Sequence, residues 1–225
     1  MHPLDNVIWT ALTTRQSNFA ETYGSASRFL PEVTLLSGFA EPSSEGYNAL
    51  AELTGPHRTT AVFLDSPYET QPGWTWVAGA PLLQMVCEKP IPGNGKSDTV
   101  VELGPKDSAA MLELTSLTKP GPFGPRTHEL GTYLGFYCDG KLVAMAGERL
   151  KVPGYTEVSA VCTHPDHTGK GYAPVLMNES MRRIRQRGET PFLHVRQDNA
   201  RAIALYERLG FQERKLLHLA VVRKT

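Results

Sequence analysis

The sequence has no long apolar run, and neither sign of charge dominates it. None of its 225 residues lie in a segment apolar enough to cross a bilayer, and Met1 to Asp5 have neither the basic start nor the apolar stretch of a signal peptide. Lys plus Arg and Asp plus Glu each number 23, so the overall charge gives no sign of nucleic-acid binding. We therefore expect a cytoplasmic protein that works without a membrane or a nucleic acid.

Cysteine is scarce, and potential metal ligands are scattered. Cys87, Cys138 and Cys162 are far apart, odd in number and outside any Cys-x-x-Cys arrangement. This pattern argues against a disulfide framework or a zinc site and predicts buried thiols. His164 and His167 are three residues apart, but the sequence places no third ligand near them. We predict no metal.

The composition is that of a folded protein with an uneven distribution of charge. Apolar residues make up 40% of the chain and charged residues 20%. Residues 1–100 carry five Lys or Arg against ten Asp or Glu, whereas residues 181–225 carry eleven against four. The basic end is either a set of solvated helix and strand faces or a field that attracts an anionic ligand.

Proline and glycine mark one clear break in the chain. The stretch Lys89 to Asp98 has no apolar period, which predicts a linker between an N-terminal α/β region, residues 1–95, and a second domain, residues 100–225. In the first region, Asn6 to Ala51 favours mostly helix, and no catalytic motif is present. Two β-branched, aromatic and apolar runs predict strands at Thr59–Leu64 and Trp74–Cys87.

The second region predicts strands and helices around an antiparallel meander. Asp107 to Leu117 favours a helix, and the Pro/Gly-rich loop Lys119 to Pro125 is suited to line a substrate entrance. Tight-turn dipeptides at Asp139-Gly140 and Pro153-Gly154 then join three strands. These strands are Thr132–Cys138, Lys141–Val152 and Tyr155–Thr163, and they are followed by helix 173–187, strand 191–196, helix 199–209 and strand 216–222.

The segment Val161 to Ala173 places a strand, a glycine turn and a helix start in direct succession. Gly169 and Gly171 allow consecutive backbone N–H groups to point into one concavity, and the helix that follows adds the positive end of its dipole. Lys170 adds a positive charge. The segment is thus either an anion site suited to a pyrophosphate or an ordinary connection between strand and helix.

Two motifs in this region resemble those of the GNAT acetyltransferases. The first has the pattern Arg or Gln, two residues, Gly, one residue, then Gly or Ala. Gly171 and Ala173 fill its last two positions, and Thr168 stands where Arg or Gln is usual. The second is His194 to Phe211, with a strand, an Asn at the helix start, a Tyr two turns later and a final Leu-Gly-Phe. The resemblance covers roughly residues 130–212.

The resemblance implies a fold and a cofactor. The implied fold is α/β (α+β), with a mixed, mostly antiparallel central sheet flanked by helices, in which two central strands splay apart to admit acetyl-CoA. The residues implied to hold this cofactor are Val161, Cys162 and Thr163 on the strand edge, Thr168, Gly169, Lys170, Gly171, Tyr172 and Ala173 in the turn, and Asn199 and Tyr206 on the second helix.

Asn199 and Tyr206 lie two helical turns apart and therefore share one face. From the residues alone, Asn199 is a helix cap and Tyr206 is a core aromatic. The resemblance implies instead that Asn199 contacts the cofactor and that Tyr206 gives a proton to the departing thiolate.

An amine acceptor must lose a proton before it attacks, and two residues are candidates to take it. His194 occupies a strand position where the protein N-terminal acetyltransferases of the same superfamily typically have Glu, and an imidazole has a reference pKa of about 6.5. Glu157 lies on the strand before the glycine turn, where other GNAT members often keep a carboxylate. A third alternative is that His194 is a hydrogen-bonded structural residue.

The leading prediction is an acetyl-CoA-dependent N-acetyltransferase that acts on a primary amine of a small molecule or a protein. A non-catalytic acyl-CoA sensor with the same fold is the alternative. The N-terminal region is predicted to be a cofactor-free relative of the same fold that shapes the acceptor pocket or a dimer interface. The protein would be a monomer or a homodimer.

Overall fold

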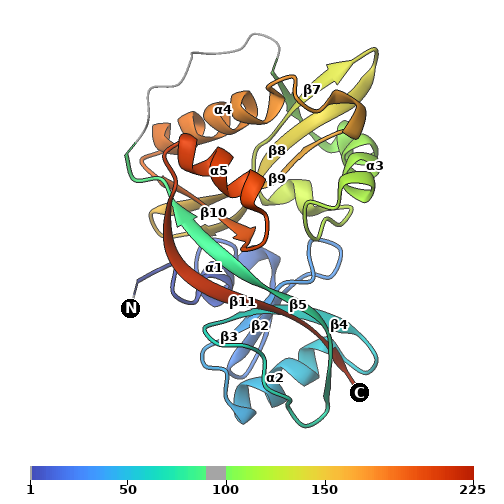
Figure 1. Ribbon diagram of the computed structural model, residues 1–225. Coiled ribbons are helices and arrows are strands. Elements are labelled where there is room, and N and C mark those ends of the chain that lie inside the picture. The colour runs from blue at the N-terminus through green and yellow to red at the C-terminus, as the bar shows by residue number, and fades with distance from the viewer. Residues whose placement is uncertain (1, 90–99) are drawn as a thin grey trace.

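The computed structural model describes residues 2–89 and 100–225 (Figure 1). Most of the predicted linker, Lys89 to Asp98, lies outside the described residues. The α-helices are α1 (Val7–Thr13), α2 (Ser44–Thr54), α3 (Ser108–Thr118), α4 (Tyr172–Gln186) and α5 (Ala200–Arg208). The strands are β1 (Ala20–Tyr23), β2 (Ala26–Phe29), β3 (Ser37–Phe39), β4 (Thr59–Leu64), β5 (Trp74–Val86), β6 (Val101–Leu103), β7 (Tyr133–Cys138), β8 (Lys141–Val152), β9 (Tyr155–Thr163), β10 (Thr190–Arg196) and β11 (Gln212–Lys224). No helix among these residues is long and apolar enough to span a membrane.

The strands form two sheets. The smaller sheet is β1-β2-β3, and the larger has the order β4-β11-β5-β10-β9-β8-β7-β6. All named neighbours in the larger sheet are antiparallel except β9 and β10, which are parallel. This confirms the predicted α/β (α+β) class with a mixed, mostly antiparallel central sheet.

The helical prediction for Asn6 to Ala51 is wrong over its middle. Only α1 and α2 are α-helical there, and β1 and β2 between them form a hairpin with Tyr23 opposite Ala26. Gly24 begins the two-residue turn with φ +52°, a conformation that glycine adopts without strain. The Gly-Ser pair between two short strands was the sequence signal for this hairpin. The helical spacing of apolar residues on both sides made the signal easy to miss.

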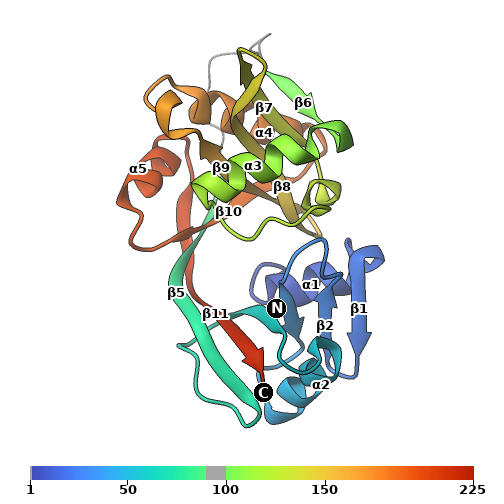
Figure 2. The ribbon, with the colours of Figure 1, turned by 90° about the vertical axis from the view of Figure 1, so that its right-hand side faces the viewer.

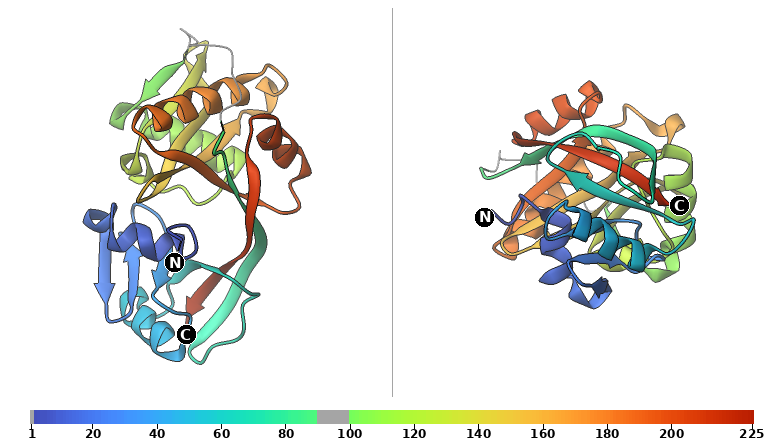
Figure 3. Two further views of the ribbon diagram at one scale, coloured as in Figure 1. Left: turned by 90° about the vertical axis from the view of Figure 1, so that its left-hand side faces the viewer. Right: turned by 90° about the horizontal axis from the view of Figure 1, so that it is seen from below.

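The larger sheet combines strands from both ends of the chain. β5, from residues before 95, lies between β10 and β11, and β11 in turn separates β5 from β4. The long strands β5 and β11 run side by side from the part that holds α4 and α5 to the part that holds α2 (Figures 2 and 3). The proposed regions 1–95 and 100–225 therefore share one sheet, and their independence as domains stays a prediction.

Helices cover both faces of the larger sheet. Figure 2 shows α3 in front of the strands β7 to β9 and α4 behind them. Met177 and Met181 of α4 pack with Leu193 and Val195 of β10, while the preceding and intervening side chains of that strand point to the opposite face.

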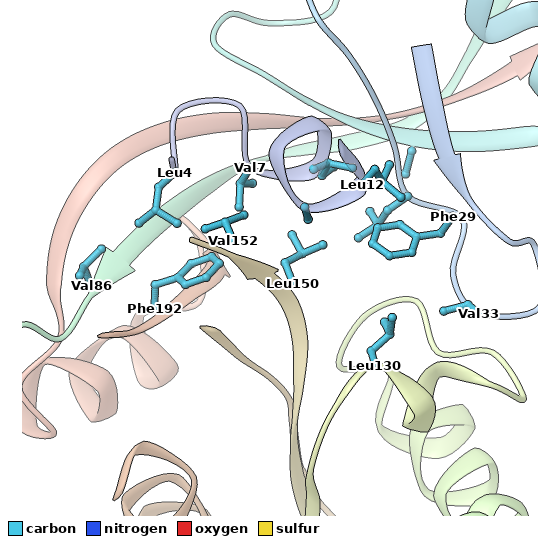
Figure 4. Close-up of a cluster of buried hydrophobic side chains, with 14 residues drawn as sticks. Leu4, Val7, Leu12, Phe29, Val33, Val86, Leu130, Leu150, Val152 and Phe192 are labelled. Carbon is cyan, nitrogen blue, oxygen red and sulfur yellow. The ribbon is translucent and has the colours of Figure 1, made fainter. Parts of the chain in front are cut away.

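The opposite face is closed by the N-terminal segment. Leu4 and Val7 lie in one buried cluster with Leu150, Val152 and Phe192 from β8 and β10 (Figure 4). Leu4, Leu150, Val152 and Phe192 are each fully buried. Burial of a side chain of this size stabilises a fold by about 1.5–3 kcal/mol, so the cluster ties the chain's first residues firmly to the strands of the second region.

Candidate functional site

A gap opens between β9 and β10. The two strands pair only from Thr190 opposite Tyr155 to Phe192 opposite Glu157. Beyond that point β9 pairs with β8 alone and β10 with β5 alone, in the part of the chain that the structure describes. The free edge of β9 includes Val161, Cys162 and Thr163. These are the residues of the strand edge that the family resemblance implied would hold the cofactor.

A β-bulge shapes β9 at this gap. Cys162 pairs with Met145 and Ser159 with Gly147, so β9 has one residue more than β8 over this stretch. Ala160 takes up the extra length in a left-handed conformation with φ +52°. The Cys162 side chain packs in the cluster below α3, and burial raises the pKa of its thiol to about 11, so it stays protonated at neutral pH.

The glycine turn has the geometry of an anion site. Gly169 and Gly171 have φ of +78° and +79°, and a Cβ at either position would meet no atom within 4 Å. Glycine is therefore required here for its backbone conformation. Gly171 is the N-cap of the 15-residue helix α4, whose first turn has no acidic residue and no side-chain cap. Its N–H groups remain available to a ligand.

Other residues of the turn support its shape. The Thr168 hydroxyl donates to the carbonyl of Pro165 at 3.0 Å, so this side chain stabilises the turn. The ring of Tyr172 packs on Phe136 with centroids 4.7 Å apart. Lys170 is exposed, and Ala173 is partly buried in the first turn of α4.

At α5, Asn199 is a helix cap and Tyr206 is a core aromatic, as their residue types alone predict. The Asn199 Oδ1 accepts from the backbone N–H of Ala202 at 3.1 Å, which caps the helix. Tyr206 packs edge-on to Phe211, with centroids 6.1 Å apart, against the apolar cluster under α4 and α5. Burial raises the pKa of Tyr206 to about 12.

The two candidate bases lie in direct contact. His194 Nδ1 is 2.7 Å from Glu157 Oε1, and both side chains are almost completely buried. Arg149 Nη2 and Nε donate to the same carboxylate at 2.7 and 2.9 Å, and the N–H of Leu150 donates to it at 3.2 Å. The His194 Nε2 faces the amide nitrogen of Gln84 at 3.1 Å.

These contacts set the charge of Glu157. Burial alone would raise its pKa, but the charge of Arg149 and the hydrogen bonds from Arg149 and His194 together lower the pKa to about 2. The carboxylate is therefore ionised and already accepts four hydrogen bonds. Sequence reasoning missed Arg149 and Gln84, whose only signal is a polar residue within a strand that is otherwise largely apolar.

A further polar group lies next to this cluster. The hydroxyl of Tyr133 is buried and has no hydrogen-bond partner among the described residues. Burial raises its pKa well above the usual range, while the charge of Arg149 lowers this pKa and the charge of Glu157 raises it by smaller amounts. Phe123, from the loop predicted to line the substrate entrance, covers the Tyr133 ring with centroids 5.7 Å apart.

Six of the eleven basic residues at the C-terminal end form ion pairs. Arg182 and Arg183 pair with Glu179 at 2.6 and 2.9 Å, and Arg187 pairs with Glu148 at 2.7 Å. Arg214 and Lys215 likewise have acidic partners. Neither predicted explanation, solvated faces or a field for an anionic ligand, included this pairing with acidic side chains.

Comparison with solved structures places the chain in a family. A protein from Novosphingobium aromaticivorans assigned to the GNAT acetyltransferases is 34% identical, with a TM-score of 0.93 and complete coverage of both chains. The chain belongs to the GNAT family. A GCN5-related N-acetyltransferase from Kribbella flavida shares the fold at 17% identity, with a TM-score of 0.61 and coverage of 98% of this chain and 96% of that one.

Two sequence matches fall on the GNAT motifs. The FR47-like protein family matches residues 133–219, from β7 into β11. A mycothiol acetyltransferase from Saccharomonospora viridis is 46% identical over 57 residues, which is 25% of this chain and 19% of that protein. The match therefore spans about a fifth of the length of this curated relative. The GNAT family and the splayed β9–β10 gap confirm the resemblance seen in the sequence.

Proposed function

We propose that the chain transfers an acetyl group from acetyl-CoA to a primary amine of a small molecule or a protein. The observation that carries this proposal is the glycine turn at the start of α4, placed beside the gap between β9 and β10. The backbone N–H groups of residues 168–173 would bind the diphosphate, and the free edge of Val161 to Thr163 would pair with the amides of the pantetheine arm. Bound acetyl-CoA supplies an acetyl group activated as a thioester.

The acceptor must reach the thioester as a free amine. An alkyl amine with a pKa of about 10.4 is unprotonated in only about one molecule in 2,500 at pH 7, so a nearby proton acceptor is needed. Glu157 is ill suited, because its low pKa and four hydrogen bonds leave it little tendency to bind a proton. We assign the proton to His194, with Glu157 stabilising the resulting imidazolium.

Tyr206 is proposed to protonate the departing thiolate. Its pKa of about 12 keeps the hydroxyl protonated throughout the physiological range. Full transfer to a thiolate with a conjugate-acid pKa of about 8.5 is uphill by about 3.5 units, or about 5 kcal/mol. Tyr206 therefore acts first as a hydrogen-bond donor to the sulfur, and proton transfer follows as charge develops there.

The N-terminal region is proposed to be a cofactor-free relative of the same fold. Its order of three antiparallel strands, helix and strand, β1-β2-β3-α2-β4, repeats the order β7-β8-β9-α4-β10. Leu36, directly before β3, forms a parallel bridge with Ala61 of β4, and β9 pairs with β10 in the same parallel direction in the second half.

The helix that corresponds to α4 is not suited to bind phosphate. Ser43 caps α2 by accepting from the N–H of Gly46 at 3.2 Å, and Glu45 lies in the first turn with Glu41 just before it. The capped N–H groups and the two carboxylates disfavour an anion at this position. This contrast supports a single acetyl-CoA site.

One observation favours the alternative of a non-catalytic acyl-CoA sensor. Both ring nitrogens of His194 and all acceptor positions of Glu157 are engaged, as in a purely structural cluster. Calorimetry with acetyl-CoA, followed by thiol release with a panel of amines, separates the two functions. Binding with amine-dependent thiol release supports the enzyme, and binding without release by any amine tested supports the sensor. No binding at millimolar acetyl-CoA would refute both.

A further inference from the structure

A continuous chain of buried and half-buried polar side chains crosses the larger sheet. We name it the transverse chain, and it uses five adjacent strands, β11, β5, β10, β9 and β8. Its members, in spatial order, are Asp5, Arg214, Gln84, His194, Glu157 and Arg149. Asp5, which precedes α1, and Gln84, on β5, belong to the N-terminal region. One of the two hydrogen bonds of the His194 ring, that with Gln84, therefore comes from the N-terminal region.

Strand register brings these side chains into line. His194 and Gln84 are directly opposite each other on β10 and β5. Arg214 lies at a β-bulge of β11 opposite Gln84, and Arg149 lies at a β-bulge of β8 opposite Glu157. A bulge redirects the side chain that it carries, and here both bulges direct a guanidinium into the transverse chain.

The direction of each hydrogen bond follows from the groups that can only donate or can only accept. Arg214 is a donor only, and its Nη1 lies 2.7 Å from Gln84 Oε1, so this atom is the amide oxygen. The Gln84 nitrogen donates to the carbonyl of Leu4 at 3.0 Å and meets His194 Nε2 at 3.1 Å. Since the amide nitrogen only donates, His194 Nε2 must be the acceptor.

The second ring nitrogen then has one possible role. Glu157 is an ionised carboxylate that only accepts, so His194 Nδ1 carries the proton and donates it to Glu157 Oε1. We infer that Gln84 and Arg214 are positioning residues that keep Nε2 of His194 unprotonated, while Glu157 holds the ring proton on Nδ1. The catalytic consequence of this inference rests on the proposed role of His194 as the proton acceptor.

The same contacts explain how the N-terminal region controls this lone pair. A proton added at Nε2 gives an imidazolium whose Nδ1–H still points at Glu157, but whose new N–H faces the N–H of Gln84. The Gln84 amide can turn to present its oxygen only by losing its bonds to Leu4 and Arg214. Proton uptake therefore requires Gln84 to be displaced from His194, for example when the acceptor amine enters.

The tautomer of His194 can be read directly by NMR in the full chain. Long-range ¹H–¹⁵N correlation spectra distinguish protonated from unprotonated ring nitrogens, and the loss of one set of signals in H194Q assigns them. We expect the wild-type spectrum at neutral pH to show Nδ1 protonated and Nε2 bare. In Arg214→Met the Gln84 amide loses one of the two bonds that orient it, and in Gln84→Met the donor that faces Nε2 is gone. In both variants a larger fraction of His194 should carry a proton on Nε2 as well as on Nδ1, which stays protonated against the Glu157 carboxylate.

Gln16→Met is the matched control. Gln16 is a second buried glutamine of the N-terminal region, but it bonds only to backbone groups of β8, the carbonyl of Arg149 at 2.7 Å and the N–H of Lys151 at 3.0 Å. Its loss should destabilise the fold without changing the His194 tautomer. Arg214 is partly exposed, so Arg214→Met keeps the test available should Gln84→Met not fold.

Two results would overturn the inference. One is a wild-type ring protonated on Nε2 at neutral pH, and the other is an unchanged fraction of Nε2 protonation in both Arg214→Met and Gln84→Met. With an amine substrate in hand, Arg214→Met should lower kcat by about tenfold or more, while the Kd of acetyl-CoA stays within about twofold. A protein that shows the expected tautomer but binds no acetyl-CoA would refute the proposed function alone.

Discussion

The change Gly171→Ala tests whether the turn before α4 binds an anion through its backbone. Gly171 has φ +79°, and a Cβ there meets no neighbouring atom, so the cost of alanine is conformational strain of about 1–2 kcal/mol. The strain is relieved when the turn rotates its peptide groups away from the shared concavity. Loss of one hydrogen bond to a charged diphosphate costs about 1.5–3 kcal/mol, which raises the Kd of acetyl-CoA by about 10- to 100-fold.

Gly188→Ala is the control for this change. Gly188 follows the C-terminal end of α4 with φ +76° and equally open surroundings, about 25 Å along the helix from Gly171. Urea unfolding should show a similar loss of stability for the two variants, and titration calorimetry should show weaker acetyl-CoA binding for Gly171→Ala only. Equal Kd values in the two variants would refute the anion-site argument.

Three further predictions concern the buried polar groups. Tyr206→Phe should lower kcat by about 100-fold or more and leave the Kd of acetyl-CoA within about twofold, and a parallel fall in affinity would count against a proton-donor role. Tyr133→Phe removes a buried hydroxyl that has no partner among the described residues, and should raise the unfolding free energy by about 1 kcal/mol. A lower unfolding free energy in urea would instead show that the hydroxyl has a partner. Since the pKa of Glu157 is lowered from 4.5 to about 2 on folding, its ionised form stabilises the native state above pH 4.5, and this contribution disappears as the pH falls to about 2. Glu157→Gln should remove that part of the acid dependence. It should also lower the free energy of unfolding by about 3–5 kcal/mol at pH 7, because Arg149 is left buried without its partner. If the variant keeps the wild-type acid dependence of unfolding, Glu157 is not its source.

Local patterns predicted much of the secondary structure after residue 55. The strands Thr59–Leu64, Lys141–Val152 and Tyr155–Thr163 have the predicted bounds, because apolar runs between tight turns leave few alternatives. The helices α4 and α5 differ from their predicted bounds by only one residue at each end, since Gly188 and Gly210 end them. The conformation of the glycine turn was also predicted, because it depends on two glycines separated by one residue.

Long-range pairing could not be predicted in the same way. The position of β5 between β10 and β11 depends on contacts between residues more than a hundred positions apart, and no local pattern records them. Arg149 and Gln84 were missed for the same reason, because only the register across strands shows that they meet Glu157 and His194. A polar residue in an apolar strand is a signal of a buried network, but it does not name the partner.

The position of β5 explains why the motif-bearing half depends on the N-terminal region. β10 pairs with β9 over three residues only, because the gap beyond Phe192 must stay open for the proposed cofactor. On its other edge β10 pairs with β5 from Phe192 to Arg196, so β5 supplies the hydrogen bonds that keep this wall of the gap extended. The same strand carries Gln84 to His194. One segment of the N-terminal region thus maintains both the shape of the gap and the orientation of the proposed base.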